Sequence, residues 1–310
     1  MISASLCYTF NQMPKHSKTK EYFRTLHHKK PVRALTAATL MLALPFVGAY
    51  SYFIGVKRFK IDHIKLEINS PHSQLGGMKI VQISDLHYGP TNKDKRYFNR
   101  IVDIINLHQP DLIVLTGDYY QWDPKYLYDL PKMLTRLRAP LGLFGCLGNH
   151  DYGSCYPGHT QNDPFEEDIT KDALERQGIR ILTNEAQLLE YKKQKFNLIG
   201  LHDLWSNQCD PNLAFKKVNS KLPTFVLSHN PDSVHIVKHD YDLMLSGHSH
   251  GGQVTWPIVG SLAIPQRSKK YSRGLHQINH RKRIYINRGL GHTFRLRINS
   301  QPEITLFEII

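Results

Sequence analysis

The chain contains a series of short apolar runs, and most of them end directly in a side chain that can bind a metal ion. The runs are KIVQIS, DLIVLTG, LGLFGCLG, FNLIGL, TFVLSH and DLMLSG. Each has the length and composition of a buried β-strand bounded by turn residues. Helix-length segments such as KRYFNRIVDIINLHQ and PFEEDITKDALERQG lie between some of them. This alternation predicts an α/β protein with stacked layers of helix and sheet.

Carboxylate, imidazole and amide side chains follow five of these runs. They are Asp85, His87, Asp118, Asn149, His150, Asp151, His229, His248 and His250. In an open α/β sheet the carboxyl ends of the strands converge on one crevice, so residues far apart in the sequence can meet there. Alternate residues of an extended backbone lie on one side, so both members of an i, i+2 pair can reach the same site.

The residue types in this pattern suit a site for two divalent cations. Carboxylate, imidazole and amide ligands bind Mn, Fe or Zn, and one Asp can bridge two ions about 4 Å apart. Gly117, Gly148 and Gly247 directly precede ligands, where they permit sharp turns. A single His or Asp at a strand end is more often a helix cap or a satisfied polar residue. Five such matches in order are poorly explained by structure alone, so the sequence predicts a metal centre.

The spelling of the motifs resembles a known family. The blocks DLH, GDY, GNHD, SHNPD and GHSHGGQ are similar to the five signature blocks of the calcineurin-like metallophosphoesterases. The last two, with PD after the His and GGQ after the His pair, are most similar to the YkuE-like branch. The resemblance covers roughly residues 60–310. It implies a four-layer αββα sandwich with a dinuclear site at the edge of the sheets.

The resemblance also implies a role for each motif residue. The residues implied to hold the first ion are Asp85, His87 and His250. Those implied to hold the second are Asn149, His229 and His248, and Asp118 is implied to bridge the two. His150 would lie near the leaving group as an acid or transition-state stabiliser, with Asp151 orienting it. Because the ligands include no thiolate, Mn is the first expectation, with Fe or Zn as alternatives.

Bulk composition restricts the partner and the compartment only loosely. The 310 residues carry a formal net charge of +14, which favours an anionic partner: a membrane surface, a phosphorylated substrate or nucleic acid. The four cysteines show none of the paired spacings of zinc or redox sites. We predict free thiols without a catalytic role at Cys7, Cys146, Cys155 and Cys209.

An apolar segment near the N-terminus predicts a membrane anchor. Residues 34–56 contain no charged side chain and, at about 1.5 Å per residue, are long enough to cross a bilayer. This divides the chain into a basic tail (1–33), an anchor helix (34–56) and a metallophosphoesterase domain (57–310). A cleaved signal peptide is the alternative, and Pro45 and Gly48 leave a kinked or interfacial helix open. Basic residues flank both ends, so the positive-inside rule favours a cytoplasmic N-terminus only weakly.

The substrate is the least constrained part of the prediction. The basic segment 267–283 could track a nucleic-acid backbone, which makes a nuclease one alternative. A non-catalytic binding protein with a vestigial site is another, although no ligand position is substituted. The predicted anchor makes nucleic acid an unlikely partner and favours a lipid-linked phosphate. Among anchored relatives, the chain resembles enzymes that hydrolyse UDP-2,3-diacylglucosamine to UMP and an acylated sugar 1-phosphate in lipid A biosynthesis. That substrate implies a bacterial inner membrane with the catalytic domain at its cytoplasmic face.

Overall fold

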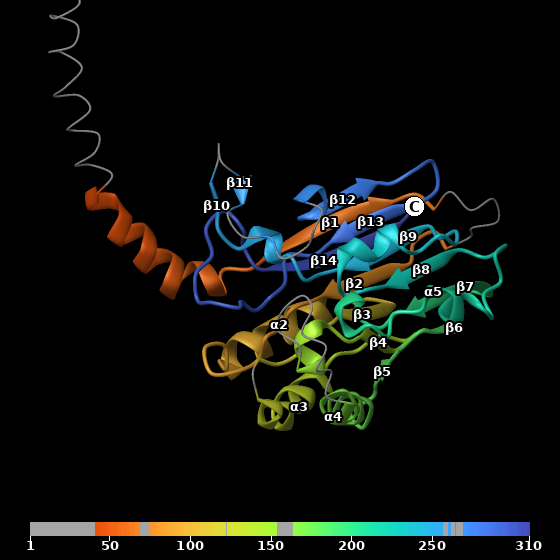
Figure 1. Ribbon diagram of the computed structural model, residues 1–310, viewed down its shortest axis with the longest axis horizontal. Coiled ribbons are helices and arrows are strands. Elements are labelled where there is room, and N and C mark those ends of the chain that lie inside the picture. The colour runs from red at the N-terminus through yellow and green to blue at the C-terminus, as the bar shows by residue number, and fades with distance from the viewer. Residues whose placement is uncertain are drawn as a thin grey trace, which may run out of the picture. The chain divides into compact units, whose positions relative to one another are not determined.

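Two mixed six-stranded sheets form the centre of the protein (Figure 1). The computed structural model describes residues 41–68, 75–121, 123–153, 164–256, 260–261, 264 and 269–310. In order across the sheet, the first contains β1 (Lys60–Leu66), β14 (Glu303–Ile309), β2 (Lys79–Ile83), β3 (Leu112–Thr116), β4 (Leu143–Cys146) and β5 (Ile179–Ile181). The second contains β12 (Gly274–Gln277), β13 (Arg283–Ile286), β9 (Leu243–Ser246), β8 (Thr224–Leu227), β7 (Gln194–Gly200) and β6 (Glu185–Tyr191). A separate two-stranded sheet pairs β10 (Thr255–Trp256) with β11 (Gly260–Ser261).

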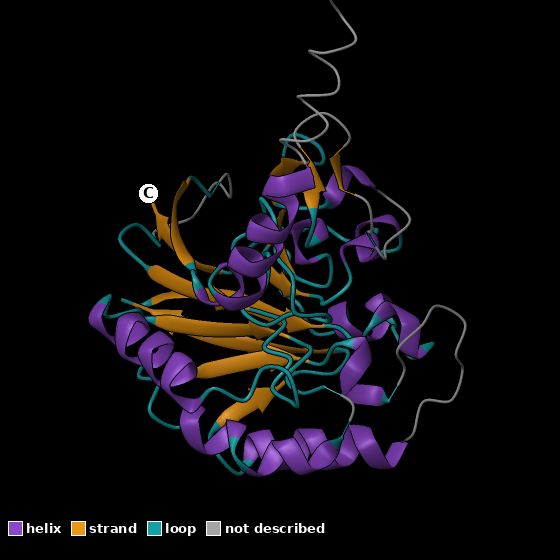
Figure 2. Ribbon diagram, turned by 90° about the vertical axis from the view of Figure 1, so that its left-hand side faces the viewer, coloured by secondary structure: helices purple, strands orange, loops and turns teal. Residues whose placement is uncertain are grey.

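Helices and short 3-10 turns connect the strands and cover the sheets (Figure 2). The α-helices are α2 (Lys95–Leu107), α3 (Leu130–Leu134), α4 (Pro164–Glu175) and α5 (Pro211–Phe215). The 3-10 turns are η1 (Gly55–Lys57), η2 (Pro124–Tyr128), η3 (Asn149–Tyr152), η4 (Leu204–Ser206), η5 (Pro231–His235), η6 (His250–Gly252) and η7 (Lys269–Tyr271). Each of the six predicted strands is confirmed, as are both predicted helices. α2 begins after Asp94, whose carboxylate accepts hydrogen bonds from the amides of Arg96 and Tyr97.

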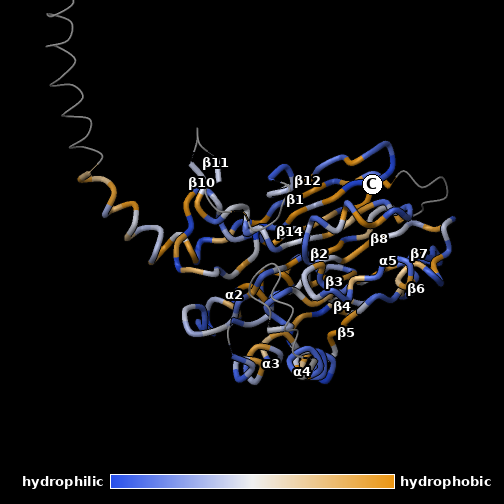
Figure 3. Tube along the Cα trace, in the orientation of Figure 1, coloured by the Kyte–Doolittle hydropathy of each residue, from blue (hydrophilic) through white to orange (hydrophobic). Residues whose placement is uncertain are grey.

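The period-two alternation of strand side chains assigns each residue to one of the layers. In β3, Leu112 and Val114 pack between the two sheets, whereas Ile113 and Leu115 pack against the helices of the first sheet. The core between the sheets also contains Phe225 of β8, so both sheets bury one face against each other. Apolar residues accordingly concentrate on the strands (Figure 3). A third cluster covers the outer face of the second sheet, where the helix layer is reduced to α5 and 3-10 turns.

The parallel strands determine where the site can form. β2, β3, β4 and β5 run parallel in the first sheet, as do β7, β8, β9 and β13 in the second. The carboxyl ends of the parallel strands in each sheet therefore lie at one edge of that sheet. The predicted α/β class is confirmed. In the first sheet β14 is antiparallel to β2 and separates it from β1. In the second, β12 is antiparallel to β13 and β6 to β7, so both sheets are mixed.

The N-terminal segment does not contain the predicted membrane-crossing helix within the residues that are described. Residues 41–53 are helical, but no helix in the described ranges is both long and apolar enough to span a bilayer. Residues 1–40, which include the predicted tail and the start of the predicted anchor, lie outside those ranges. The larger compact unit begins at Ser51. The Ser51 hydroxyl donates to the carbonyl of Arg297 at 2.7 Å and accepts from the Arg297 amide at 2.8 Å.

Burial between the sheets should contribute most of the stability. Leu198→Ala, at a side chain with no exposed area in the inter-sheet core, should lower the free energy of unfolding by about 2–5 kcal/mol. The matched control Leu213→Ala, on α5 with a 55% exposed side chain, should change it by about 0.5 kcal/mol or less. Urea denaturation followed by circular dichroism measures both. Equal losses would contradict this assignment of the core.

Candidate metal centre

The structure brings the predicted ligands together at the carboxyl ends of strands from both sheets. The first sheet contributes the residues after β2, β3 and β4, and the second contributes those after β8 and β9. All are buried: Asp85, His87, Asp118, Asn149, His229, His248 and His250. Two separate stretches of sequence, residues 85–149 and 229–250, therefore meet at one place, as the sequence predicted.

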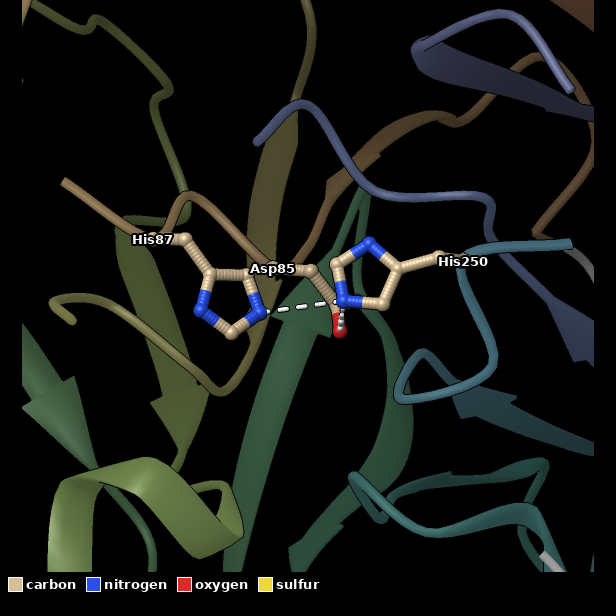
Figure 4. A group of neighbouring side chains, drawn as sticks. All are labelled: Asp85, His87 and His250. Carbon is tan, nitrogen blue, oxygen red and sulfur yellow. Dashed lines mark hydrogen bonds and ion pairs between the residues drawn. The ribbon is translucent and has the colours of Figure 1, made fainter. Parts of the chain in front are cut away.

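One group of possible ligand atoms comes from Asp85, His87 and His250 (Figure 4). Nε2 of His87 and Nε2 of His250 are 3.0 Å apart, and Nε2 of His250 is 3.4 Å from an oxygen of Asp85. The ligand atoms of all three residues lie within 4.8 Å of one another. This compactness is what three ligands of a single ion require.

A second group lies beside the first and is joined to it by Asp118. Nε2 of His229 and Nδ1 of His248 are 3.1 Å apart. Oδ2 of Asp118 is 3.2 Å from Nε2 of His229 and 3.4 Å from Nε2 of His87 in the first group. A single carboxylate oxygen thus lies beside ligands of both groups, which is the geometry expected of a bridging residue.

The donor set fits divalent cations on geometric grounds. Ligands about 2.1 Å from an ion and at right angles to each other lie about 3.0 Å apart, close to the observed nitrogen–nitrogen distances. In addition, the carbonyl of Thr116 lies 2.7 Å from Nδ1 of His229. A proton on Nδ1 would be donated to that carbonyl, and the Nε2 lone pair would then point into the site, as in many metal-binding histidines.

The electrostatics of the cluster favour a cation. Burial lowers the pKa of three imidazoles well below the usual value: those of His87, His248 and His250. Burial raises the pKa of Asp85 to about 7, against the influence of charged His229. Burial also opposes the charged form of His229, but the carboxylates of Asp118, Asp85 and Asp203 together outweigh it and raise the pKa of that ring. A divalent ion would stabilise both the carboxylates and the neutral imidazoles.

The ligands occupy a strained backbone conformation. Asp85, His87, Asp118, His248 and His250 all have φ between 41° and 68°, in the left-handed region that non-glycine residues rarely adopt. Such a conformation costs about 1–2 kcal/mol per residue, so the surrounding structure must impose it. Part of that structure is a pair of backbone hydrogen bonds, from the Asp85 amide to Gly117 and from the His87 amide to the carbonyl of Asp118. Strain of this kind is concentrated at functional sites.

Two of the three glycines that precede ligands serve a different purpose from the one the sequence suggested. Gly117 has a positive φ of 83°, as a sharp turn requires. Gly148 has an extended backbone, with φ of −107°, and is needed because a Cβ there would lie 2.6 Å from the Asp118 amide nitrogen. A Cβ at Gly247 would collide with Ser84 and Asp85. At these two positions glycine allows close approach between chain segments.

His150 and Asp151, the predicted catalytic pair, lie beside the metal-ligand groups. A ring nitrogen of His150 lies within 4.8 Å of the ligand atoms of His87 and Asp118. Burial lowers the pKa of His150. The Asp151 carboxylate accepts hydrogen bonds from the amides of Asp118, Tyr119 and Gly148 at 2.8–2.9 Å. Asp151 therefore braces the loops that carry Asp118 and His150, and its predicted role in orienting the His150 ring stays a prediction.

Sequence reasoning missed several residues around the cluster. Arg297 is buried, and its Nη2 lies 3.2 Å from Nδ1 of His250. Trp205 packs edge-on against His248, with ring centroids 4.5 Å apart. Asp203 is fully buried, and burial raises its pKa to about 6. Asp203 follows FNLIGL, so the rule that found the other site residues could have found it too. No sequence signal singles out Arg297.

Comparisons with known proteins agree with this geometry. A family model described as calcineurin-like phosphoesterase matches residues 78–252. The chain is 36% identical over 282 residues to phosphodiesterase YaeI of Escherichia coli, across 89% of this chain and 96% of that protein. It is 32% identical over 324 residues to UDP-2,3-diacylglucosamine pyrophosphatase LpxG of Chlamydia muridarum, across 90% and 98%. It is 30% identical over 297 residues to the uncharacterized metallophosphoesterase YkuE of Bacillus subtilis, across 92% and 98%.

The protein has an α/β fold of two mixed sheets, and buried carboxylates and imidazoles gather at the ends of the strands. Together with the family match, these features define the protein as a metallophosphoesterase, and hence as a hydrolase. The match covers more than half of the chain, and the relatives extend over nearly all of it. The chain belongs to the calcineurin-like phosphoesterase family, and the predicted similarity to YkuE is confirmed.

The space at Gly148 should be essential to the site. Gly148→Ala should displace Asp118, weaken Mn²⁺ binding by at least tenfold and lower the melting temperature, because the added methyl group has no room. Gly76→Ala is the matched control, since a Cβ there meets no atom within 4 Å. Isothermal titration calorimetry and thermal unfolding measure the two effects. Wild-type Mn²⁺ affinity in Gly148→Ala would contradict the geometry described.

Proposed function

We propose that the protein is a phosphoesterase that uses two divalent metal ions. Asp85, His87 and His250 would hold the first ion. Asn149, His229 and His248 would hold the second, and Asp118 would bridge them. The observation that carries this proposal is the position of Asp118 Oδ2 within 3.4 Å of imidazole nitrogens from both groups. Mn is the preferred metal, with Fe or Zn as alternatives, because all the ligands are oxygen or nitrogen.

The residues around the site would divide the reaction between them. When bound, two divalent ions would supply Lewis acidity to the phosphoryl group and lower the pKa of water toward neutrality. His150 would stabilise the charge that develops on the phosphoryl oxygens, or donate a proton to the leaving group. Asp151 would hold the loops that carry Asp118 and His150 in a fixed relative position, because its carboxylate accepts hydrogen bonds from three backbone amides. No nucleophilic side chain is required.

The substrate we propose is a lipid-linked nucleotide-sugar diphosphate, with UDP-2,3-diacylglucosamine as the leading candidate. The protein would release UMP and 2,3-diacylglucosamine 1-phosphate, in lipid A biosynthesis. The similarity to LpxG supports this substrate. The similarity to a protein named phosphodiesterase supports the alternative of another lipid-linked phosphate.

Nucleic acid is a weaker candidate. Part of the basic segment that suggested it is already neutralised, because Arg281 and Lys282 pair with the two carboxylates of Asp240 and Asp242. The same segment includes β12 and the start of β13, so it is built into the edge of the second sheet.

Membrane association completes the proposal. Half of the exposed large hydrophobic side chains in the described ranges lie between residues 41 and 54, with Phe46 at 78% and Phe53 at 64% exposure. So many exposed apolar side chains in one short segment favour contact with lipid. We place the protein at the bacterial inner membrane, held by residues 34–56, with its catalytic unit at the cytoplasmic face where UDP-linked precursors occur.

The proposed roles of Asp118 and His150 predict different defects. Asp118→Ala should lose metal, because both ions depend on the bridge. His150→Ala should retain two ions per chain but lose on the order of 10² or more in turnover. Metal analysis and hydrolysis of bis-p-nitrophenyl phosphate measure these outcomes, with His280→Ala at an exposed position as the control. Wild-type turnover in His150→Ala would refute its catalytic role.

Membrane association should matter for the lipid substrate alone. Deleting residues 1–50, which ends before the compact unit begins at Ser51, should leave hydrolysis of bis-p-nitrophenyl phosphate within about twofold of wild type. Hydrolysis of UDP-2,3-diacylglucosamine in mixed micelles should fall about tenfold or more, because residence at the surface raises the effective substrate concentration. Equal losses on both substrates would indicate a folding defect. A preference for single-stranded DNA would support the nuclease alternative instead.

A further inference from the structure

A pocket of about 240 Å³ lies beside the loop that carries Asp85 and His87, and no role has been assigned to it. Its lining residues are Val56, Lys57, Pro90, Thr91, Asn92, Lys93, Asp94, His292 and Arg295. We call it the His292 pocket.

Both walls of the His292 pocket are bonded to the metal-ligand loop. On one side, the Asn92 side chain donates to the carbonyl of Leu86 at 2.8 Å. On the other, the Gly291 amide donates to the carbonyl of Asp85 at 2.7 Å, directly before His292. His292 is also close enough to His87 to lower the pKa of that ring. Residues on both sides of the pocket are therefore bonded to the backbone of the loop that carries the predicted metal ligands Asp85 and His87.

The charge of the lining residues favours an anion. Three are cations, Lys57, Lys93 and Arg295, and one is a carboxylate, Asp94. Lys57 forms an ion pair with Asp94 at 2.5 Å, which leaves two positive charges without an acidic partner in the lining. The cavity is too small for a folded partner but large enough for a phosphate group and its neighbouring atoms.

The buried histidine is the second and independent observation. His292 is 1% exposed and lines the pocket. Burial and the positive charges of Arg297 and Arg295 lower the pKa of His292 to about 4, against a smaller opposing effect of the Thr91 backbone, so the ring is neutral near pH 7. Neither ring nitrogen makes a hydrogen bond of normal geometry with the described residues. Burying polar atoms without partners is costly, so such an arrangement suggests a ligand that supplies them. A phosphate oxygen could accept a hydrogen bond from this ring.

We propose that the His292 pocket is an anion subsite, which holds the phosphate group adjacent to the one hydrolysed at the metal centre. This inference rests on the proposed phosphoesterase function and extends it, since it selects substrates with two linked phosphates. Arg295 and Lys93 supply positive charge, and His292 contributes a hydrogen bond from the floor. Arg295 also lies over the ring of Tyr52, 4.8 Å from its centroid, beside the exposed Phe53 and Ile54. These apolar side chains would accommodate an acyl chain of the sugar that is attached to the second phosphate.

The test compares two non-hydrolysable ligands by isothermal titration calorimetry with the Mn-loaded protein at matched free Mn²⁺. Methylphosphonate carries one phosphonate, and methylenediphosphonate carries two. Wild type should bind methylenediphosphonate more tightly. Arg295→Gln and His292→Leu should each weaken methylenediphosphonate about tenfold, the cost of losing one hydrogen bond to a charged group, and weaken methylphosphonate less than about twofold. Arg180→Gln, at a half-exposed arginine on β5, removes the same charge elsewhere and should change neither.

Thermal unfolding separates a binding role from a structural one. His292→Leu replaces polar atoms that lack partners by an apolar group of similar size, so its melting temperature should equal or exceed that of wild type. Equal weakening of both ligands, no weakening of either, or a lower melting temperature in His292→Leu would overturn the proposal. If wild type fails to hydrolyse UDP-2,3-diacylglucosamine while the diphosphonate difference is observed, the lipid substrate is wrong and the subsite stands.

Discussion

The burial of many ionisable groups in one small volume is the constraint on which the rest of the structure depends. Two aspartates and four histidines meet at the ends of strands from both sheets, and each is at most 5% exposed, so water solvates their charges poorly. In the absence of a cation, burial penalises the carboxylates and holds most of the imidazoles neutral. Five of these residues are also held in the left-handed backbone region. Energetic costs of this size persist only where a function requires them, and a pair of divalent ions would relieve the electrostatic part.

The scaffold is organised to hold this cluster. Parallel strands bring their carboxyl ends to one edge, and the absence of a side chain at Gly148 and Gly247 lets loops from different strands approach within contact distance. Asp151 then ties the Asp118 loop to the start of η3 through three amides. Arg297 links His250 to Ser51, the first residue of the compact unit, through its side chain and its backbone. The catalytic cluster and the N-terminal boundary of the unit are therefore parts of one hydrogen-bonded network.

The sequence predicted the central strands and the ligands because both are local signals. An apolar run followed directly by Asp, Asn or His can be recognised without knowing its neighbours, and this found β2, β3, β4, β8 and β9 together with the polar side chains at their ends. Strands β1 and β14 were not predicted. β14 comes from the end of the chain and inserts between β1 and β2, and this pairing arises only through tertiary folding. Arg297 and His292 were missed for the same reason, since only tertiary folding brings them to the site. The reason for glycine at Gly148 was also inaccessible, because it depends on the distance to another loop.

The central claim is that two metal ions lie on either side of Asp118. Anomalous diffraction at the manganese absorption edge, from crystals of the Mn-loaded protein, tests this most directly. The account predicts two peaks about 4 Å apart, one beside Asp85, His87 and His250 and the other beside His229 and His248, with Asp118 between them. A single peak, or peaks that do not contact Asp118, would contradict it.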